Sequence, residues 1–306
     1  MVAGLTGTQW CRRAIGDRSM KALVFGHSGQ VATELRRRAQ HHDVKVEALG
    51  RAGADLSNPS QCADAIRGTD ADVIINAAAY TAVDKAEEDL DLAQLINADS
   101  PGAMARAAKA RSLPFLHIST DYVFGGSGTT PWTTDHPTAP LGAYGKTKLD
   151  GERQIAQAGG WHAILRTSWV FSAHGNNFVK TILRLAETRD RLTIVADQIG
   201  GPTPAADIAD ALLVMAKSKA GTEGGLFHFA GAPYASWADF AREIIVQSGL
   251  TTQIEDIPST DYPTPAPRPL NSRLNCDRLN VVFGIGRPEW KTGLSDVLRE
   301  LNSATG

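Results

Sequence analysis

Residues 21–32 read KALVFGHSGQVA, and this stretch decides the fold class. A short apolar run leads into Gly26, Gly29 lies three residues further on, and a helical pattern follows. In dinucleotide-binding turns the first glycine permits a tight turn, and the second lets a pyrophosphate approach the helix N-terminus, where free N–H groups favour anions. The third position of the pattern is Ala32, which is small enough for the helix to pack on its strand. We therefore expect a cofactor-binding turn that consists of Gly26, His27, Ser28, Gly29, Gln30 and Val31.

Apolar runs and helical patterns alternate downstream of this turn. The expected strands are residues 21–25, 44–49, 72–76, 115–119 and 161–167, and a long helix is expected at 91–111. Such alternation predicts an α/β protein with a Rossmann-type, doubly wound parallel sheet and right-handed crossovers. Beyond residue 169 we expect helices at 176–189, 206–217 and 236–247, strands at 192–195 and 227–230, and a proline-rich wrap at 257–273.

The end of the second expected strand bears on the choice of cofactor. NAD-selective sites usually place an acidic residue there to bind the ribose 2′-hydroxyl. This chain has Arg51, which suits a 2′-phosphate and favours NADPH over NADH, although a solvated loop arginine explains it equally well. Asp55 and Leu56 follow and are expected to flank the adenine ring, with Asp55 bonding its exocyclic amine. A turn carboxylate is the alternative role for Asp55.

Two further strand ends predict where a ligand would lie. In open α/β sheets, ligands collect at the carboxyl edge of the strands. Thr120 follows the fourth expected strand at that edge. The residues after the third strand are mostly small, which leaves room for a cofactor against the backbone; they are Ala77, Ala78, Ala79 and Tyr80.

Tyr144 and Lys148 are four residues apart at the start of an expected helix. On a helix this spacing puts both side chains on one face, about 6 Å apart along the axis. A phenol beside an ammonium group is a poised proton donor. The spacing is common by chance, and it acquires weight here from the glycine turn and the threonine upstream.

Bulk properties limit the class of protein. The chain has 306 residues, 42% hydrophobic content and a formal net charge of −2, so a nucleic-acid partner is not expected. No apolar run approaches the ~20 residues of a membrane span. Cys11, Cys62 and Cys276 are far apart and odd in number, which suits reduced thiols in a cytoplasmic protein. We interpret residues 1–19 as a disordered leader or as the product of an upstream start codon before Met20.

With these features in place, the chain resembles the extended short-chain dehydrogenase/reductase group. Within that group it is similar to the branch that reduces the C4 ketone of dTDP-4-dehydro-L-rhamnose with NADPH. The segments that carry the resemblance are GHSGQVA, DVIINAAAYTAVDKAE, HISTDYVFGG, PLGAYGKTKLDGE, LRTSWVF with GNNFVKTILRLA, DQIGGPT and YPTPAPRPLNSRL. We assign residues 20–168 with about 199–230 to an NADP-binding domain, and about 169–198 with 231–306 to a smaller C-terminal α/β substrate domain.

The resemblance implies roles for particular residues. Tyr144 would protonate the sugar C4 oxygen, Lys148 would lower the pKa of Tyr144 and bond the nicotinamide ribose, and Thr120 would hydrogen-bond the carbonyl. The nucleotide sugar would contact Val83, Asp84, Asp121, Tyr122 and Trp169, and its diphosphate would contact Arg268. Plain core packing for Trp169 and a solvated surface position for Arg268 are the alternatives.

The resemblance also bears on Mg²⁺ and on assembly. Some members of the branch form dimers through a Mg²⁺ site built from glutamates of both partners. Glu34 matches one such position, but another is Ala206 here, which argues against a metal-bridged dimer. We expect a monomer or a homodimer.

Four other functions compete with this interpretation, and the first is another nucleotide-sugar 4-ketoreductase of the same fold. Nucleotide-sugar 4,6-dehydratases of the same fold follow the threonine with an Asp-Glu pair, whereas Asp121 is followed by Tyr122 here. Epimerases are harder to separate, although they usually keep NAD bound and do not consume it. A non-catalytic relative, the regulatory subunit of methionine adenosyltransferase, keeps much of the same motif set.

Overall fold

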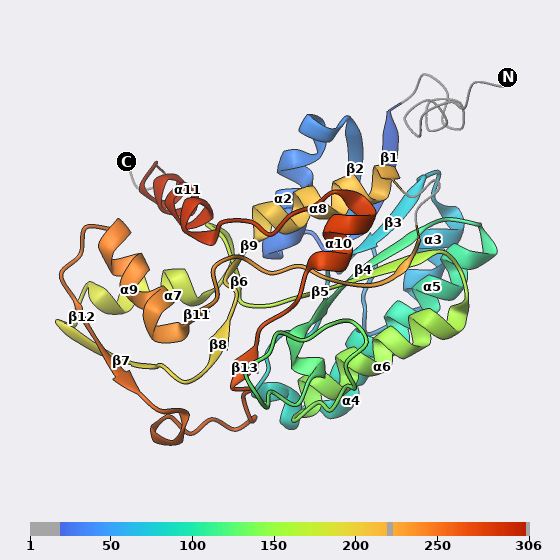
Figure 1. Cartoon of the computed structure of the whole chain (residues 1–306). Helices are drawn as coiled ribbons and strands as arrows, with labels where there is room; N and C mark the ends of the chain where they lie inside the picture. Colours follow the sequence, from blue (N-terminus) through green and yellow to red (C-terminus); the bar gives the residue numbers. More distant parts are fainter. Residues whose placement is uncertain (1–18, 219–222, 304–306) are drawn as a thin grey trace, which may run out of the picture.

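A six-stranded parallel sheet forms the centre of the larger part of the molecule (Figure 1). The computed structural model describes residues 19–218 and 223–303. The strands lie in the order β10-β5-β4-β3-β1-β2, and every neighbouring pair is parallel. They are β1 (Met20–Phe25), β2 (Val44–Leu49), β3 (Val73–Asn76), β4 (Phe115–Thr120), β5 (His162–Thr167) and β10 (Gly225–His228). The predicted Rossmann-type fold is confirmed.

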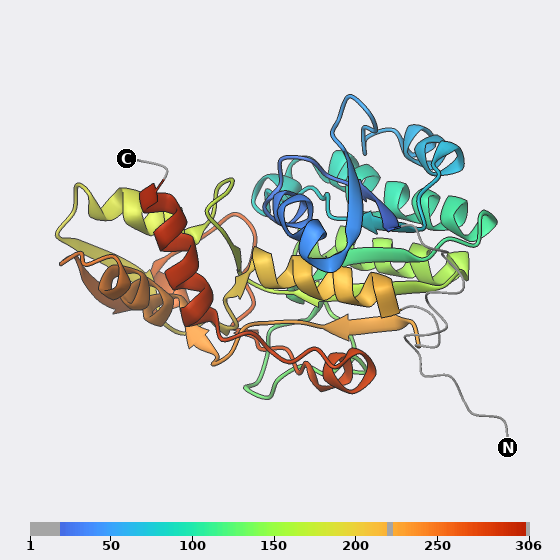
Figure 2. The same cartoon turned by 90° about the horizontal axis from the view of Figure 1, so that it is seen from above.

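Helices cover both faces of this sheet (Figure 2). Side chains of β1 alternate between the faces, because successive residues of a strand point in opposite directions. Ala22 and Val24 pack with α2 (Gln30–Arg38) and α8 (Ala205–Ser218). Leu23 and Phe25 pack on the other face with the helices α3 (Pro59–Gly68), α5 (Ser100–Ala110) and α6 (Ala143–Ala158). The carboxyl ends of the strands are thereby left open between the two helical layers.

A smaller part with its own hydrophobic core lies beside the sheet (Figure 1). Phe171, Phe240 and Trp290 are buried in this core. Its elements are β6 (Val170–Phe171), α7 (Phe178–Ala186), β7 (Arg191–Val195), β8 (Ile199–Gly200), β9 (Thr203–Pro204), β11 (Ala235–Ser236), α9 (Trp237–Gln247), β12 (Gln253–Ile257), β13 (Asn271–Ser272) and α11 (Trp290–Ser303). The remaining short elements are η1 (Ala39–His42), η2 (Lys85–Glu87), η4 (Asp121–Val123), η5 (Ser259–Asp261) and α10 (Asp277–Phe283).

The long helix expected at 91–111 is interrupted. It consists of α4 (Leu90–Gln94), a π-helical turn η3 (Leu95–Asp99), and α5. Pro101 lacks the N–H that would bond the carbonyl of Asn97 in an α-helix, and the N–H of Ser100 bonds Leu95 five residues back instead. The wider turn places Asn97 against α6, where a Cβ added to Gly151 would lie only 2.1 Å from the Asn97 carbonyl oxygen.

Two expectations concern the N-terminal segment and the cysteines. The expected leader falls on residues 1–18 and Ser19; residues 1–18, which include Cys11, lie outside the described part of the chain. Cys62 and Cys276 are buried and free. No helix in 19–218 or 223–303 is both long enough and apolar enough to cross a membrane.

Candidate active site

A cavity of about 770 Å³ opens at the carboxyl edge of the sheet. This volume lies within the range of about 300–1,000 Å³ that small-molecule sites occupy. The cavity wall includes every residue that we expected at the site from the sequence, except Tyr80, Asp84 and Arg268. The glycine turn, the strand-end threonine and the Tyr-x-x-x-Lys pair therefore surround one space, although they are far apart in the sequence.

The glycine turn has the geometry of an anion site. Gly26 has φ +116°, a conformation that L side chains rarely adopt, and a Cβ there would lie 3.3 Å from the Cβ of Ala32. Gly29 is the N-cap of α2, and nothing lies within 4 Å of where its Cβ would be. The first N–H groups of α2 thus start beside the cavity, and the helix dipole favours a negative group there.

Asp55 already has a structural role. Its Oδ1 accepts a hydrogen bond of 2.9 Å from the backbone N–H of Ser57, and this bond is the main reason why the pKa of Asp55 is lowered. The turn carboxylate, which was the alternative from the sequence, is therefore present, while Asp55 still lines the cavity with Arg51 and Leu56. Arg51 is exposed.

Tyr144 and Lys148 lie on the first turns of α6, which begins at Ala143. A Cβ on Gly145 would lie 2.2 Å from the carbonyl oxygen of Tyr122, so the helix approaches η4 more closely than another residue allows. The rings of Tyr122 and Tyr144 pack edge to face with centroids 5.5 Å apart. The glycine therefore fixes the position of both tyrosines in the cavity wall.

The electrostatics of this pair differ from the expectation. Burial is the main effect on both groups: it raises the pKa of Tyr144 to about 12 and lowers the pKa of Lys148 to about 8. A hydrogen bond with Thr120 lowers the pKa of Tyr144, but it does not offset burial. The expected net lowering of the Tyr144 pKa is therefore absent from this structure, because removal of water from the phenol outweighs the influence of a nearby cation. At neutral pH Tyr144 is a protonated donor.

His117 is a buried residue of the site that the sequence analysis missed. It lies on β4, and its Nε2 is 3.1 Å from Nζ of Lys148, which also donates to the carbonyl of Ile118 at 2.7 Å. Its Nδ1 is 3.0 Å from the amide nitrogen of Asn76. Burial lowers the pKa of His117 well below its usual value, so the imidazole is neutral, and Nε2 can accept from the ammonium group in the tautomer that carries the proton on Nδ1. A histidine inside an apolar strand, three residues before Thr120, was the signal available in the sequence.

Thr120 and Asp121 form the polar end of the cavity. The hydroxyl of Thr120 donates to Asp121 Oδ1 at 3.1 Å and accepts from the N–H of Tyr122 at 3.2 Å. Burial raises the pKa of Asp121 to about 6. Within the described chain, Asp121 Oδ2 and the hydroxyl of Thr167 are buried and have no hydrogen-bond partner, and both residues line the cavity. Buried polar atoms are usually bonded, so these two are available to a ligand or to water.

A buried ion pair lies next to the polar end of the cavity. Arg166 on β5 is 2% exposed and Glu152 on α6 is 4% exposed. The guanidinium donates twice to the carboxylate, from Nε at 2.9 Å and from Nη2 at 2.6 Å. Ser119 donates to the same carboxylate at 2.5 Å, and its neighbour in the chain is Thr120. The pair therefore ties β4, β5 and α6 together next to the site.

Trp169 lies where the sheet meets the smaller part. It has φ +50°, an unusual value for a residue with a side chain, and its ring stacks on Trp237 with centroids 3.6 Å apart. A Cβ on Gly200 would lie 2.7 Å from the Trp169 ring. Trp169 packs against the core of the smaller part and also lines the cavity, so the core packing that was the alternative from the sequence is present.

Three expected site residues have partners outside the cavity wall. Tyr80 donates its hydroxyl to Asp89 at 2.8 Å. Asp84 and Arg268 form an ion pair of 2.8 Å. The pair joins the TAVDKAE segment to the proline-rich wrap beside Val83, which does line the cavity.

A family model described as the RmlD substrate binding domain matches residues 20–303. The chain belongs to this family. The match covers the larger part, in which α6 carries Tyr144 and Lys148, and the smaller part, which contains α11.

Relatives in the family have closely similar lengths and sequences. The chain is 44% identical over 280 residues to a dTDP-4-dehydrorhamnose reductase of Sinorhizobium fredii, with 89% of this chain and 94% of the relative covered. It is 41% identical over 298 residues to the dTDP-4-dehydrorhamnose reductase of Escherichia coli, with 94% and 99% covered. A crystal structure of a dTDP-4-dehydrorhamnose reductase from Bacillus anthracis in complex with NADP has a TM-score of 0.86 and 30% identity, with 92% of this chain and 99% of that chain covered.

Proposed function

We propose that the chain is an NADP-dependent oxidoreductase that reduces the C4 ketone of dTDP-4-dehydro-L-rhamnose to dTDP-L-rhamnose, the last step of dTDP-rhamnose biosynthesis. The observation that carries this proposal is that Thr120, Tyr144 and Lys148 line one cavity with the glycine turn. Relatives with 44% and 41% identity bear the name of this reductase, and a structure of one member is a complex with NADP. We further propose a cytoplasmic location and a monomer or homodimer.

The two parts of the molecule have separate proposed roles. Residues 20–168 with about 199–230 would bind the cofactor, and about 169–198 with 231–306 would bind the nucleotide sugar. In support, the turn from Gly26 to Val31 lies on the sheet side of the cavity and Trp169 lies at the border of the smaller part. Ligands of open α/β sheets collect at such crevices.

In the proposed reaction, bound NADPH supplies a hydride to C4 of the sugar. Tyr144 donates the proton that the developing alkoxide requires, and the hydroxyl of Thr120 turns from Asp121 to the carbonyl oxygen. A donor whose pKa is near 12 stays protonated until the alkoxide forms, and the charge of Lys148 then stabilises the phenolate that remains. His117 holds the ammonium group of Lys148 in place.

The sugar nucleotide would occupy the side of the cavity that Val83, Asp121, Tyr122 and Trp169 line. Arg268 is the proposed partner of the diphosphate. Because Arg268 now pairs with Asp84, the carboxylate would share or release the guanidinium when a diphosphate binds. Asp84 thus keeps the cation oriented beside the cavity.

A direct assay tests the proposed function. Purified protein, NADPH and dTDP-4-dehydro-L-rhamnose are mixed, and oxidation of the cofactor is followed by absorbance. We expect oxidation that depends on the sugar. If the cofactor is not consumed, the chain is an epimerase or a non-catalytic relative, and if dTDP-glucose is dehydrated instead, it is a 4,6-dehydratase.

Arg51→Ala is expected to weaken the binding of NADPH more than that of NADH. An exposed arginine beside the adenosine end of the cavity can pair with the 2′-phosphate, which NADH lacks. We expect the ratio of the two dissociation constants to change by about tenfold, as the loss of one charge-assisted contact allows. Fluorescence titration with each cofactor measures this ratio, and Arg36→Ala on the exposed face of α2 is the control. Equal weakening of both cofactors would remove the phosphate role.

His117→Leu is expected to shift the alkaline limb of the kcat profile to lower pH. Nε2 accepts from the charged form of Lys148, so its removal favours the neutral amine and lowers a pKa that is already about 8. The shift should be about one pH unit. His117→Gln, which restores an acceptor, should recover most of the profile, and His162→Leu at the far end of β5 should leave it unchanged. An unshifted profile in His117→Leu would limit His117 to core packing.

A further inference from the structure

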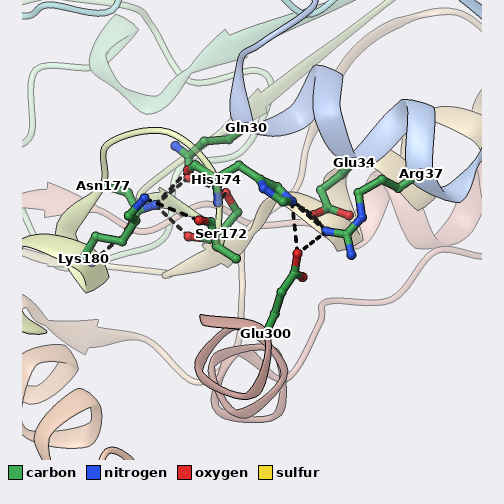
Figure 3. Close-up of polar contacts among 9 residues, drawn as sticks. Gln30, Glu34, Arg37, Ser172, His174, Asn177, Lys180 and Glu300 are labelled. Atoms are coloured by element: carbon green, nitrogen blue, oxygen red, sulfur yellow. Dashed lines mark hydrogen bonds and ion pairs between the residues drawn. The ribbon is translucent and has the colours of Figure 1, made fainter. Parts of the chain in front are cut away.

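Three segments from different parts of the chain meet at Glu34 (Figure 3). Glu34 lies on α2, His174 lies between β6 and α7, and Glu300 lies on α11. Glu34 is 5% exposed, and its Oε1 is 3.0 Å from His174 Nε2 and 3.2 Å from Arg37 Nη1. A carboxylate as buried as this needs a cation or donors close to it, because an unpaired buried charge is costly.

One nitrogen of Arg37, Nη1, contacts the side chains of Glu34, His174 and Glu300. Its Nη1 is 2.7 Å from Glu300 Oε1 and 2.6 Å from His174 Nε2, in addition to its contact with Glu34. The imidazole nitrogen has one role at a time, and it either accepts from Arg37 or donates to Glu34. One guanidinium therefore bridges two carboxylates and contacts a histidine from three separate segments.

The same set of ligand atoms could otherwise suit a metal ion. Single atoms of Glu34, His174 and Glu300 all lie within 4.8 Å of one another. The Mg²⁺ site that the resemblance implies at Glu34 nevertheless does not fit, because a guanidinium with a permanent positive charge already contacts these atoms. A divalent ion would have to displace Arg37, and Ala206 offers it no ligand atom.

The ion cluster continues into the cavity wall through Gln30 (Figure 3). Gln30 Oε1 accepts from the hydroxyl of Ser172 at 2.9 Å and from Nδ2 of Asn177 at 3.0 Å. Residues 172–177 are thus bound to α2 at two levels, by Gln30 at its first turn and by Glu34 and Arg37 further along. Gly175 and Asn176 in the middle of this segment line the cavity next to the glycine turn.

We propose that Arg37 takes the place of a divalent cation in a metal-independent clamp, formed by Glu34, Arg37, His174 and Glu300, that holds residues 172–177 against the start of α2. Through Gly175 and Asn176 the clamp positions the wall of the cofactor site, and this consequence rests on the proposed function. Exposed ion pairs contribute little as a rule. This one differs because its central carboxylate is buried and because it joins three segments that are distant in the sequence.

The clamp is tested with Mn²⁺, which reports on the site without any enzymatic assay. Wild-type protein is expected to show no Mn²⁺ binding at this site by electron paramagnetic resonance, and the same Tm in EDTA and in millimolar Mg²⁺. Arg37→Met removes the competing charge, so Mn²⁺ should bind this variant at least about tenfold more tightly than the wild type. Adding Glu34→Gln to that variant should abolish the gain, and Arg36→Met on the same helix should behave as wild type. Equal Mn²⁺ affinity in wild type and Arg37→Met would overturn the proposal, as would wild-type binding that Glu34→Gln removes.

A second measurement tests the link to the cofactor. Without metal, Arg37→Met is expected to raise the Kd for NADPH by about three- to tenfold and to lower Tm. Arg37 is half exposed, so the variant should fold. An unchanged Kd together with the gain of Mn²⁺ binding would overturn the positioning role. A wild-type protein that fails to bind NADPH would instead refute the proposed function, while the Mn²⁺ result would still decide the metal-independent clamp.

Discussion

Tyr144→Phe is expected to lower kcat by about 10²- to 10⁴-fold, which is the usual contribution of a positioned general acid. The substitution removes the phenolic hydroxyl and leaves the ring that packs edge to face with Tyr122. The Kd for NADPH should therefore stay within about twofold, since the glycine turn and Lys148 are untouched. Steady-state kinetics measure kcat, and a fluorescence titration measures the Kd for NADPH.

The pH dependence separates the roles of Tyr144 and Lys148. With a pKa of about 12, Tyr144 stays protonated through the physiological range, so its ionisation does not change kcat in that range of pH. The rate should instead decline as pH rises through about 8, where Lys148 loses its charge. Tyr234→Phe, whose hydroxyl bonds the Leu274 carbonyl away from the cavity, is the matched control. A kcat near the wild-type value in Tyr144→Phe would show that the proton comes from water or from another side chain.

Arg166→Met is expected to lower the free energy of unfolding by about 3–5 kcal/mol, because it leaves the buried carboxylate of Glu152 without its cation. The guanidinium also lies 5.0 Å from the ring centroid of Phe124, so a cation–π contact is lost as well. Urea denaturation measures the difference. Activity should fall with stability, since the pair joins β4, β5 and α6 beneath Thr120.

A double variant distinguishes the unpaired charge from lost packing. Arg166→Met with Glu152→Leu removes both charges and should recover much of the stability that the single variant loses. Arg153→Met is the control, because Arg153 forms an exposed pair with Asp150 next to Glu152 and should change stability by about 0.5 kcal/mol or less. A loss in Arg166→Met no larger than in Arg153→Met would show that the buried pair is not a major source of stability.

Local patterns were enough to predict the sheet and most of the cavity wall. The run from residue 21 to 32 predicted the glycine turn, and successive strand ends placed Thr120 and the alanines after β3 at one edge. These predictions succeeded because a parallel sheet brings the carboxyl ends of its strands together whatever the intervening chain does. The spacing of Tyr144 and Lys148 likewise survives folding because it lies within one helix.

Features that depend on long-range contacts could not be predicted. The π-helical turn is an exception, because it follows from the missing N–H of Pro101, a local signal that the prediction of one helix at 91–111 did not use. The pKa of Tyr144 depends on burial by groups from other segments, so the expected influence of Lys148 was outweighed. The pairing of Arg268 with Asp84 spans 184 positions, and no local signal indicates it.

The path of the chain between the two parts has a consequence for how the protein folds. The sheet is incomplete until β10 has been synthesised, yet residues 169–198, which belong to the smaller core, precede β10 in the chain. That smaller core in turn needs α11, which ends at Ser303. Neither core is formed by one contiguous segment, so neither can fold while the rest of the chain is still being synthesised. Contacts between residues that are distant in the sequence also slow folding. We therefore expect one late, cooperative folding step. Before that step, a nascent chain that lacks its last helix is accessible to chaperones and proteases.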